Sequence, residues 1–536
     1  MLSFSAHRYP YASQRQSVFA RRGMVAASQP LAAEAGIDIM RRGGNAIDAA
    51  IATAAALTVV EPTGCGIGGD AFALVWVKGQ LHGLDASGHA PAALNIDAVK
   101  AAGHTQMPTY GWTPVTVPGC PSAWAELSRR FGRLPFADLL KPAISLAADG
   151  FPLSPVVAHQ WQVALDEFSA HREPAMQAWF DTFLIDGRAP QAGELFRNPA
   201  QAHTLQALAD STCESFYRGE IAERIDQASR AAGGYLRKED LHAYKPRWVE
   251  PISINYRGYE VWEIPPSGQG LVALMTLQIL QGFEFDHRDS LQTWHRQIEA
   301  LKLAYADGLH HITDAEHMRV AVADLLSPGY TERRRKLIGE RALTPAAGDP
   351  HASGTVYLAT ADAEGNMVSF IQSNYHGFGS GVVVPDSGIA LQNRGQEFSL
   401  EANHANNLVA GKKTFHTIIP GFLTKDGEAV APFGVMGGYM QPQGHVQMVM
   451  NLVDFGLNPQ AALDAPRWQW LGDRKVGIEQ GASRDLAAAL ARLGHEVSVA
   501  CDSTDYGRGQ IIVRDPHSGV LCGGTEPRAD SHIAVW

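Results

Sequence analysis

The sequence predicts an α+β fold in which helices are layered on β-sheet, and three observations predict it. Helical and strand-like patterns occur together in both halves of the 536-residue chain. An alanine-rich apolar segment at 46–60 has the composition of a buried helix, and a β-hairpin begins abruptly at Thr355. Helices and sheets each have one apolar side to bury, so a mixture of both packs most readily as layers.

The first elements are a short strand and a helix. Met24–Ala27 is apolar and strand-like. Ser28 and Pro30 are helix-start signals, and the helical pattern that follows runs to Arg42. Gly43–Gly44 ends this helix, because glycine adopts the dihedral angles that close a helix without steric cost.

A second helix follows directly. Asn45 stands where an N-cap belongs and starts the helix Ala46–Val60, which ends at Glu61–Pro62. Fifteen residues with an internal Asp48 are too few for a membrane helix, which needs about 20 apolar residues, so the segment is interpreted as a core helix. The short apolar run Ala71–Val77 then predicts a buried strand.

The middle of the chain is mostly helical in pattern, and strands return after Gly354. Within Ala123–Arg341 the clearest helix is Trp294–Ala306. Thr355–Ala361 and Met367–Gln372 have strand composition and flank a turn. Further strands are predicted at Gly388–Gln392, His416–Thr424, Val430–Val435 and Gly509–Arg514, and further helices at Gln441–Phe455, Pro459–Asp464 and Ser483–Arg492.

Composition favours a small-molecule enzyme over a nucleic-acid or membrane protein. The 44 basic and 55 acidic residues give a net charge of −11 without long runs of like charge, which disfavours both nucleic acid and an anionic membrane as partners. The five cysteines form no CxxC pair, so neither a disulfide framework nor a zinc knuckle is indicated. The first twenty residues lack the apolar stretch of a secretory signal, and we expect a cytoplasmic protein.

Three motifs resemble known sites but are better explained structurally. Gly64–Gly69 satisfies GxGxxG, yet it follows a helix and precedes a strand, the reverse of the order in dinucleotide sites, which favours a close backbone turn. Gly377–Gly381 lacks the Lys-Ser/Thr of a phosphate loop and predicts a tight turn at the wall of a pocket. A polar helix end, and no metal site, is predicted for Asp307, His310, His311, Asp314, Glu316 and His317.

Nine segments, taken together, resemble the gamma-glutamyltransferase family in order and approximate spacing. The similarity extends from about Gly23 to Trp536, nearly the whole chain. Each segment alone is a weak signal, whereas nine in order are specific. The segments are Gly43–Ala50, Gly64–Gly69, Val117–Gly119, Pro265–Gly268, Gly354–Thr355, Phe378–Gly381, Gly437–Gly438, Phe455–Leu457 with Ala465–Arg467, and Asp530.

The resemblance implies an N-terminal-nucleophile hydrolase with an αββα sandwich made jointly by two chains. One precursor would cut itself after Gly354, giving a large chain, 1–354, and a small chain, 355–536. The chains would remain packed together, with a dimer of such heterodimers as a further alternative. The segment before the cut, Ala342–Ser353, has the composition of an exposed linker. Neither a cofactor nor a metal is expected, since protein groups supply every part of the chemistry.

Thr355 is the expected nucleophile. A threonine hydroxyl is weak by itself, and the α-amino group freed by cleavage is an adjacent base with a pKa near ~7.7–8.0. Gly354 lets the scissile peptide be approached closely. The resemblance matches Ser373 to a hydroxyl that tunes the nucleophile, and Gly437–Gly438 to an oxyanion hole worth about 3 kcal/mol per donor. Taken alone, these positions are better explained as a strand serine and a turn diglycine, and it is their spacing from Thr355 that favours the catalytic roles.

The substrate-binding positions depart from the family pattern. Ser87 stands where the family has an arginine that holds the substrate carboxylate. His416 and Thr417 replace a pair of serines that assist it. The remaining positions, which match the residues that hold the substrate α-amino group, are Tyr375, Arg394 and Glu397, and Arg394 stands where a neutral amide is usual.

The position of the arginine predicts a different substrate. A guanidinium fork binds a carboxylate at two points, so Arg394 favours an acid group close to the scissile carbonyl. A local ion pair with Glu397 is the alternative for Arg394, and a packed core residue is the alternative for His416. Within the family the chain looks most similar to the branch that hydrolyses oxamate to oxalate and ammonia in purine breakdown. A gamma-glutamyl or acyl side-chain substrate, and an uncleaved binding protein, remain alternatives.

Overall fold

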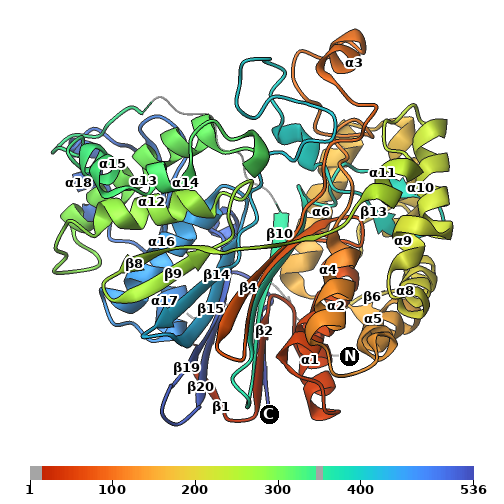
Figure 1. Ribbon diagram of the computed structural model, residues 1–536, viewed down its shortest axis with the longest axis horizontal. Coiled ribbons are helices and arrows are strands. Elements are labelled where there is room, and N and C mark those ends of the chain that lie inside the picture. Colours follow the sequence, from red (N-terminus) through yellow and green to blue (C-terminus); the bar gives the residue numbers. More distant parts are fainter. Residues whose placement is uncertain (1–14, 346–353) are drawn as a thin grey trace.

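The computed structural model describes residues 15–345 and 354–536. Two seven-stranded sheets face each other in the centre of the molecule, with helices on the outer side of each (Figure 1). This arrangement confirms the predicted αββα sandwich. Strand pairing within both sheets is antiparallel throughout.

Each sheet takes strands from both sides of the Gly354–Thr355 bond. The first sheet has the order β21 (His532–Val535), β2 (Gly23–Ala27), β10 (Gly354–Asp362), β11 (Met367–Tyr375), β3 (Asp70–Val77), β4 (Gln80–Ala86), β7 (Arg247–Val249). The second has the order β1 (Val18–Ala20), β20 (Leu521–Thr525), β19 (Arg508–Arg514), β15 (Glu428–Met436), β14 (Gly421–Lys425), β9 (Tyr259–Glu263), β8 (Ile252–Tyr256). A cut at this bond leaves two chains interleaved in both sheets, so neither sheet is complete with one chain alone.

Helices cover both outer faces. The first sheet is covered by α1 (Pro30–Arg41), α2 (Ala46–Val60) and α4 (Cys120–Phe131), and behind them lie α5 (Phe136–Asp149), α6 (Pro155–Ala170), α7 (Gln177–Phe183) and α8 (Pro199–Ser211). The second sheet is covered by α12 (Gly270–Leu280), α16 (Met440–Val453) and α17 (Pro459–Asp464), with α13 (Leu291–His311), α15 (Pro328–Arg335) and α18 (Arg484–Arg492) outside them. The other elements include α3 (Ile96–Ala101), α9 (Glu214–Arg218), α10 (Glu220–Ala231), α11 (Lys238–Ala243), α14 (Val322–Leu325), β5 (Phe151–Pro152), β6 (Leu195–Phe196), β12 (Val383–Val384), β13 (Ile389–Ala390), β16 (Trp468–Trp470), β17 (Lys475–Glu479) and β18 (Glu496–Ala500).

Helix α2 is the core helix that the sequence predicted. The Asn45 side chain accepts hydrogen bonds from the N–H groups of Ile47 and Asp48, while the Asp48 carboxylate accepts one from the Asn45 N–H, which completes a capping box. All 15 helical residues are buried, between β10 and β11 on one side and α5 on the other. The hairpin of β10 and β11 and the strand β3 are likewise confirmed.

Two predictions about local structure were wrong, each because a distant contact decided the outcome. Gln29, not Ser28, caps α1, since the Ser28 hydroxyl donates to Glu61 instead. Residues 416–420 are not part of a strand, because the N–H groups of Ile418 and Ile419 donate to side chains rather than to a neighbouring strand. The mostly helical segment 123–341 also contains β7, β8 and β9, two of which extend the second sheet.

Other sequence predictions concern single segments. None of the described helices combines the length and apolarity needed to cross a membrane. The five cysteines are all free thiols, three of them buried. The predicted linker falls largely on residues 346–353, which lie outside the described residues.

Candidate active site

Thr355 lies at the start of β10 in a β-bulge. Its side chain is buried, and two residues of β11, Ser373 and Asn374, stand opposite this one residue where the register shifts. The Thr355 Oγ1 and Ser373 Oγ atoms are 3.1 Å apart, within hydrogen-bond distance. Bulges are frequent beside active sites because they redirect one side chain out of the regular pleat. The expected nucleophile is therefore held by a partner hydroxyl at an irregular point of the sheet.

The Gly64–Gly69 turn packs directly against this bulge. A Cβ atom at Gly64 would lie 3.0 Å from the Thr355 carbonyl oxygen, and one at Gly69 would lie 2.6 Å from the Ser373 carbonyl oxygen. Contacts this short leave no room for a side chain, which confirms the interpretation of the motif as a close backbone turn. The turn thus fixes the backbone on both sides of the Thr355–Ser373 pair.

Gly437 and Gly438 form a turn between β15 and α16. Both have positive φ, +126° and +56°, which glycine tolerates and other residues rarely adopt. Within the described part of the chain neither glycine N–H donates to a backbone carbonyl. A Cβ at Gly434 would lie 2.4 Å from the ring of Tyr357, so the end of β15 lies across the start of β10. Unpaired N–H groups before a helix such as α16 favour a negatively charged ligand.

Arg394 is a buried cation with half of its fork unpaired. Its side chain is 1% exposed. Nη1 donates to Thr417 Oγ1 at 2.6 Å, and the guanidinium carbon lies 4.1 Å from the centre of the Tyr375 ring. Among the described residues, the Nε and Nη2 atoms have no hydrogen-bond partner. Burial lowers the pKa of Arg394, and nearby acidic groups oppose this shift. A buried charge with an unpaired edge is costly unless a ligand completes it.

Glu397 does not complete that edge. Its carboxylate accepts hydrogen bonds from the Tyr375 and Tyr439 hydroxyls, the latter at 2.7 Å. Since Nε and Nη2 of Arg394 remain without a partner, the local ion pair considered as an alternative does not satisfy the guanidinium. Glu397 instead anchors the tyrosine on which Arg394 is stacked.

His416 is neutral and bonded to a buried acid. Its Nε2 lies 3.1 Å from an Asp70 carboxylate oxygen, and its Nδ1 accepts from the Ile418 N–H at 3.4 Å. Burial lowers the pKa of His416 well below its usual value, and the charges of Arg394 and Lys413 act in the same direction. This network assigns the tautomer with a proton on Nε2. His416 is therefore a fixed neutral donor rather than a titrating group.

Asp70 was missed by the sequence analysis. It is fully buried, pairs with Ser373 in the ladder between β3 and β11, and is separated from its partner His416 by 346 positions. Burial raises the pKa of Asp70 to about 7, opposed chiefly by the charges of Arg394 and Lys413. The only local signal was its position directly after the glycine turn, which does not predict a pairing with a distant histidine.

The raised pKa of Asp70 predicts a pH-dependent stability. Between about pH 4 and pH 7 the unfolded chain has released the Asp70 proton while the folded protein keeps it, so stability falls as pH rises. Because asparagine does not titrate, the Tm of Asp70→Asn minus the Tm of the parent should be roughly 2–4 °C larger at pH 8 than at pH 5. Calorimetry at pH 5 and at pH 8 measures the two Tm differences. The exposed control Asp97→Asn should show no such change, and equal differences for Asp70→Asn at both pH values contradict the prediction.

Ser87 does not replace the carboxylate-binding arginine that the resemblance led us to expect at this position. Its N–H and hydroxyl both donate to one oxygen of Asp85, at 2.8 and 2.6 Å. The other Asp85 oxygen forms an ion pair with the buried Lys413 at 2.7 Å. The next residue, Gly88, donates its N–H to Asp70 at 3.3 Å. Ser87 therefore lies beside Gly88, which contacts Asp70, while the Ser87 hydroxyl itself donates to Asp85.

The remaining predicted residues form one continuous buried group. Starting from Thr355, Ser373 accepts a hydrogen bond from the Tyr375 N–H at 2.8 Å, the Tyr375 ring lies under Arg394, and Arg394 donates to Thr417. Three contacts, through Ser373 and Tyr375, link the threonine hydroxyl to the guanidinium. The expected nucleophile and the unpaired cationic fork thus belong to one chain of buried contacts.

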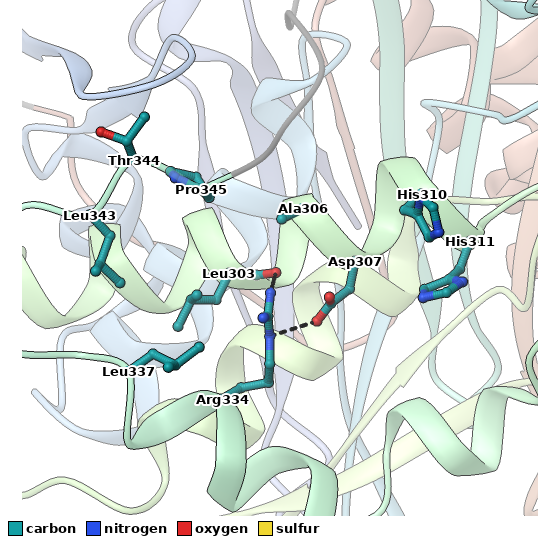
Figure 2. Close-up of a pocket in the computed structure, with 10 residues that line it drawn as sticks. All are labelled: Leu303, Ala306, Asp307, His310, His311, Arg334, Leu337, Leu343, Thr344 and Pro345. Carbon is teal, nitrogen blue, oxygen red and sulfur yellow. Dashed lines mark hydrogen bonds and ion pairs between the residues drawn. The ribbon is translucent and has the colours of Figure 1, made fainter. Parts of the chain in front are cut away.

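Two cavities lie elsewhere in the described structure. One of about 400 Å³ is bounded by α13, α15 and the segment ending at Pro345 (Figure 2), and in it Arg334 forms an ion pair with Asp307 at 2.9 Å. His310 and His311 are the last residues of α13 at its rim. The other, of about 520 Å³, is bounded by α7, β6 and the start of α8. Neither cavity is lined by Thr355 or Arg394.

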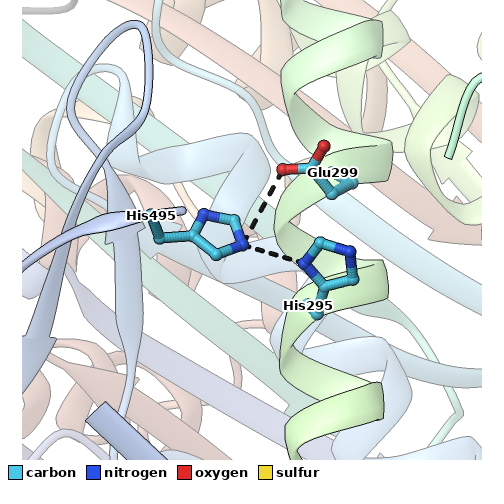
Figure 3. A group of neighbouring side chains, drawn as sticks. All are labelled: His295, Glu299 and His495. Carbon is cyan, nitrogen blue, oxygen red and sulfur yellow. Dashed lines mark hydrogen bonds and ion pairs between the residues drawn. The ribbon is translucent and has the colours of Figure 1, made fainter. Parts of the chain in front are cut away.

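A second buried cluster has the residue types of a metal site. His295, Glu299 and His495 bring their ligand atoms within 4.8 Å of one another (Figure 3). However, His295 and His495 are bonded to each other at 2.8 Å, and the second ring nitrogen of His295 lies 2.9 Å from the Gly339 carbonyl. Lys302 lies 2.7 Å from Glu299 and 3.5 Å from His495. An ordered hydrogen-bond chain with Lys302 as its cation accounts for the whole cluster.

Comparison with known proteins gives consistent matches over the full length. A family model described as gamma-glutamyltranspeptidase matches residues 32–536. The chain is 38% identical over 527 residues to an oxamate amidohydrolase proenzyme of Klebsiella pneumoniae subsp. pneumoniae, covering 96% of this chain and 98% of that protein. It is 35% identical over 523 residues to a glutathione hydrolase-like proenzyme of Bacillus subtilis (strain 168), with the same coverage. The crystal structure of a cephalosporin acylase from Bacillus halodurans matches with a TM-score of 0.97 at 59% identity, covering 100% of this chain and 99% of that one.

Proposed function

This chain belongs to the gamma-glutamyltranspeptidase family, and on that premise we propose that it is a self-processing amidohydrolase for a short amide that carries a carboxylate. Our best candidate substrate is oxamate, which gives oxalate and ammonia. Thr355 is the nucleophile of both self-cleavage and turnover. The large chain, 1–354, and the small chain, 355–536, stay together after cleavage.

Self-cleavage begins with the Thr355 hydroxyl. Its oxygen attacks the Gly354 carbonyl carbon, an ester forms as the peptide C–N bond breaks, and the freed nitrogen takes up the hydroxyl proton. Water then hydrolyses the ester, which leaves a carboxylate on Gly354 and a free α-amino group on Thr355. The partner for the hydroxyl in this step is Ser373, whose oxygen lies 3.1 Å away.

Turnover uses the same hydroxyl with the new amine as its base. The α-amino group, with a pKa near ~7.7–8.0, accepts the hydroxyl proton as Oγ1 attacks the substrate amide carbon. The N–H groups of Gly437 and Gly438 stabilise the resulting oxyanion. The amine returns its proton to the leaving nitrogen, ammonia departs, and water hydrolyses the acyl ester on Thr355.

One observation carries the choice of substrate: the unpaired Nε and Nη2 of the buried Arg394. These two N–H groups form one edge of the guanidinium fork, which matches the two oxygens of a carboxylate. The edge lies close to Thr355 through Ser373 and Tyr375, so a carboxylate held there is near the attacked carbonyl. Oxamate has its carboxylate and amide on adjacent carbons, as this geometry requires.

The other predicted residues orient the fork or close the pocket. Thr417 accepts the Nη1 hydrogen of Arg394 and leaves the opposite edge for the substrate, while Glu397 fixes the Tyr375 ring beneath it. His416, neutral and tied to Asp70, adds no charge that competes for the substrate acid. Ser87 cannot hold the carboxylate from the outer side of the pocket, because its hydroxyl donates to Asp85.

A second candidate is the removal of an acyl side chain, as from a cephalosporin. It is favoured by the 59% identity with the cephalosporin acylase structure over the whole chain. A gamma-glutamyl amide is a third substrate class, consistent with the glutathione hydrolase-like relative.

The test combines intact mass with three substrates. Two chains, with the small chain starting at Thr355, are expected from mass spectrometry and N-terminal sequencing of the purified protein. Ammonia release from oxamate should exceed both p-nitroaniline release from a gamma-glutamyl anilide and side-chain release from a cephalosporin by at least about tenfold in kcat/KM, because only oxamate has its carboxylate on the carbon next to the attacked carbonyl. Preferred hydrolysis of either other substrate replaces oxamate with that class. A single uncut chain overturns the mechanism itself.

A further inference from the structure

We infer that Gln269, with Tyr305 behind it, is a positioning residue that sets the oxyanion-binding turn at Gly437–Gly438. Both residues belong to the large chain, whereas the turn belongs to the small chain. The inference rests on the proposed function, in which the two glycine N–H groups receive the oxyanion.

Gln269 is fully buried at the N-terminus of α12, and its amide faces the turn. Its Nε2 donates to the Gly438 carbonyl at 2.9 Å and to the Thr417 carbonyl at 2.6 Å. Its backbone N–H donates to the His416 carbonyl at 2.9 Å, which fixes the base of the side chain. Both hydrogens of the Gln269 side-chain amide therefore form hydrogen bonds, one to Gly438 in the glycine turn and one to Thr417, whose hydroxyl accepts from Arg394.

Tyr305 supports the same turn one residue further on. Its hydroxyl donates to the Tyr439 carbonyl at 2.5 Å and lies 3.3 Å from the Gln269 Oε1 atom. Tyr305 is fully buried on α13, so its position does not depend on solvent. The Gln443 side chain adds a second hydrogen bond to the Tyr439 carbonyl at 3.1 Å.

Three successive carbonyls of the turn are thus held by hydrogen bonds. The Gly437 carbonyl accepts the Met440 N–H at 2.9 Å, the Gly438 carbonyl accepts from Gln269, and the Tyr439 carbonyl accepts from Tyr305. A peptide carbonyl and the N–H of its own unit point in opposite directions. The N–H in the same unit belongs to the next residue, so the Gly437 carbonyl, held by Met440, sets the direction of the Gly438 N–H, while Gln269 and Tyr305 fix the two peptide units that follow and so hold the C-terminal side of Gly438 in place.

The constraint matters because the turn consists of two glycines. Glycine has no Cβ to restrict rotation, so a Gly-Gly turn has several accessible backbone conformations. Preorganised donors stabilise an oxyanion only when they do not have to reorient during the reaction. Gln269 adds a side-chain restraint on the Gly438 carbonyl, which also accepts the Gln441 N–H at 3.1 Å, and the same amide links the turn to Thr417 and hence to the acid-binding fork. The large chain therefore controls the geometry of a catalytic turn in the small chain.

The test compares Gln269→Leu and Gln269→Glu with the control Gln278→Leu. Gln278 lies on the same helix and also donates to a backbone carbonyl, that of Leu326, at 2.9 Å, but away from the turn. We expect both Gln269 variants to lower kcat for oxamate at least about tenfold with KM changed less than about threefold. Gln278→Leu should keep the kcat of the parent, with a Tm similar to that of the Gln269 variants. The activity of the isosteric Gln269→Glu variant relative to the parent at the same pH should rise as pH falls, because only the protonated acid donates to the carbonyls.

Self-cleavage gives a second measurement that needs no substrate. Pulse-labelled precursor from cell-free translation should be converted at least about tenfold more slowly in Gln269→Leu than in Gln278→Leu, since cleavage passes through an oxyanion at the same threonine. Equal cleavage rates in the two variants overturn the inference and leave the proposed function standing. A parent precursor that never cleaves overturns both. A parent that cleaves but ignores oxamate overturns only the substrate, and the cleavage rates then decide the role of Gln269.

Discussion

Replacing Thr355 by alanine is expected to leave one uncut chain of 57.8 kDa and to lower amide hydrolysis at least about 10³-fold. The variant lacks the hydroxyl that attacks Gly354, so no α-amine is freed, and it lacks the nucleophile of turnover as well. Intact mass measures the first effect, and ammonia release from oxamate measures the second. Thr355→Ser keeps both groups and should cleave and turn over, although more slowly.

The same strand provides a matched control for Thr355. Thr360 is also a buried threonine of β10, and its hydroxyl donates to the Ala46 carbonyl at 2.7 Å. Thr360→Ala loses that hydrogen bond and is expected to lower the free energy of unfolding by about 1 kcal/mol while cleaving normally. Cleavage of Thr355→Ala at the parental position, or an uncut Thr360→Ala protein with a parental Tm, contradicts the assignment of Thr355 as nucleophile.

Replacing Arg394 by lysine is the second large effect that we expect. Lysine keeps the positive charge but has no planar fork and no Nε donor, so two-point binding of a carboxylate is lost. Truncation of one partner in a buried charge pair costs about 2–5 kcal/mol, which corresponds to a fall of roughly 10²-fold or more in kcat/KM for oxamate. Steady-state kinetics measure the fall, and the inhibition constant of oxalate should rise in parallel.

The neutral diamide oxamide separates acid recognition from general damage at this site. It has no carboxylate, so its kcat/KM should change little in Arg394→Lys while that of oxamate falls. Arg528→Lys is the matched protein control, because Arg528 is a nearly buried arginine whose fork already pairs with Glu479 and Glu526. It should lose stability but keep the parental preference for oxamate over oxamide. Equal loss for both substrates in Arg394→Lys contradicts a role in binding the acid.

Much of the fold follows from short-range features of the sequence. The capping box at Asn45, the continuous apolar composition of Ala46–Val60 and the turn between β10 and β11 each involve residues only a few positions apart. Such signals survive in a single sequence because the interacting groups are neighbours along the chain. The expected αββα sandwich came from the order of nine motifs rather than from any local pattern, and the two-sheet topology confirms it.

The sequence also indicated where the chemistry lies, through the Gly354–Thr355 pair and the arginine at 394. It did not predict the strands β8 and β9 or the irregular backbone at 416–420. Among the described strands, β8 pairs only with β9, its neighbour in the chain, whereas a distant partner decides the structure of β9 and of 416–420. β9 is paired with β14 across more than 150 residues of chain, and the Ile419 N–H donates to Gln441 rather than to a strand. Propensity is a weak guide wherever a tertiary contact supplies the hydrogen bond.

By itself, then, the sequence determined the helices with strong caps, the hairpin that starts at Thr355, and the family to which its motifs belong. Only the tertiary structure decided that Asp70 and His416, 346 positions apart, share a hydrogen bond, that Arg394 keeps an unpaired edge, and that Gln269 holds the Gly438 carbonyl. The physical reason is that burial and the choice of hydrogen-bond partner arise when distant segments pack, and a buried polar group is satisfied by whichever partner that packing brings within reach.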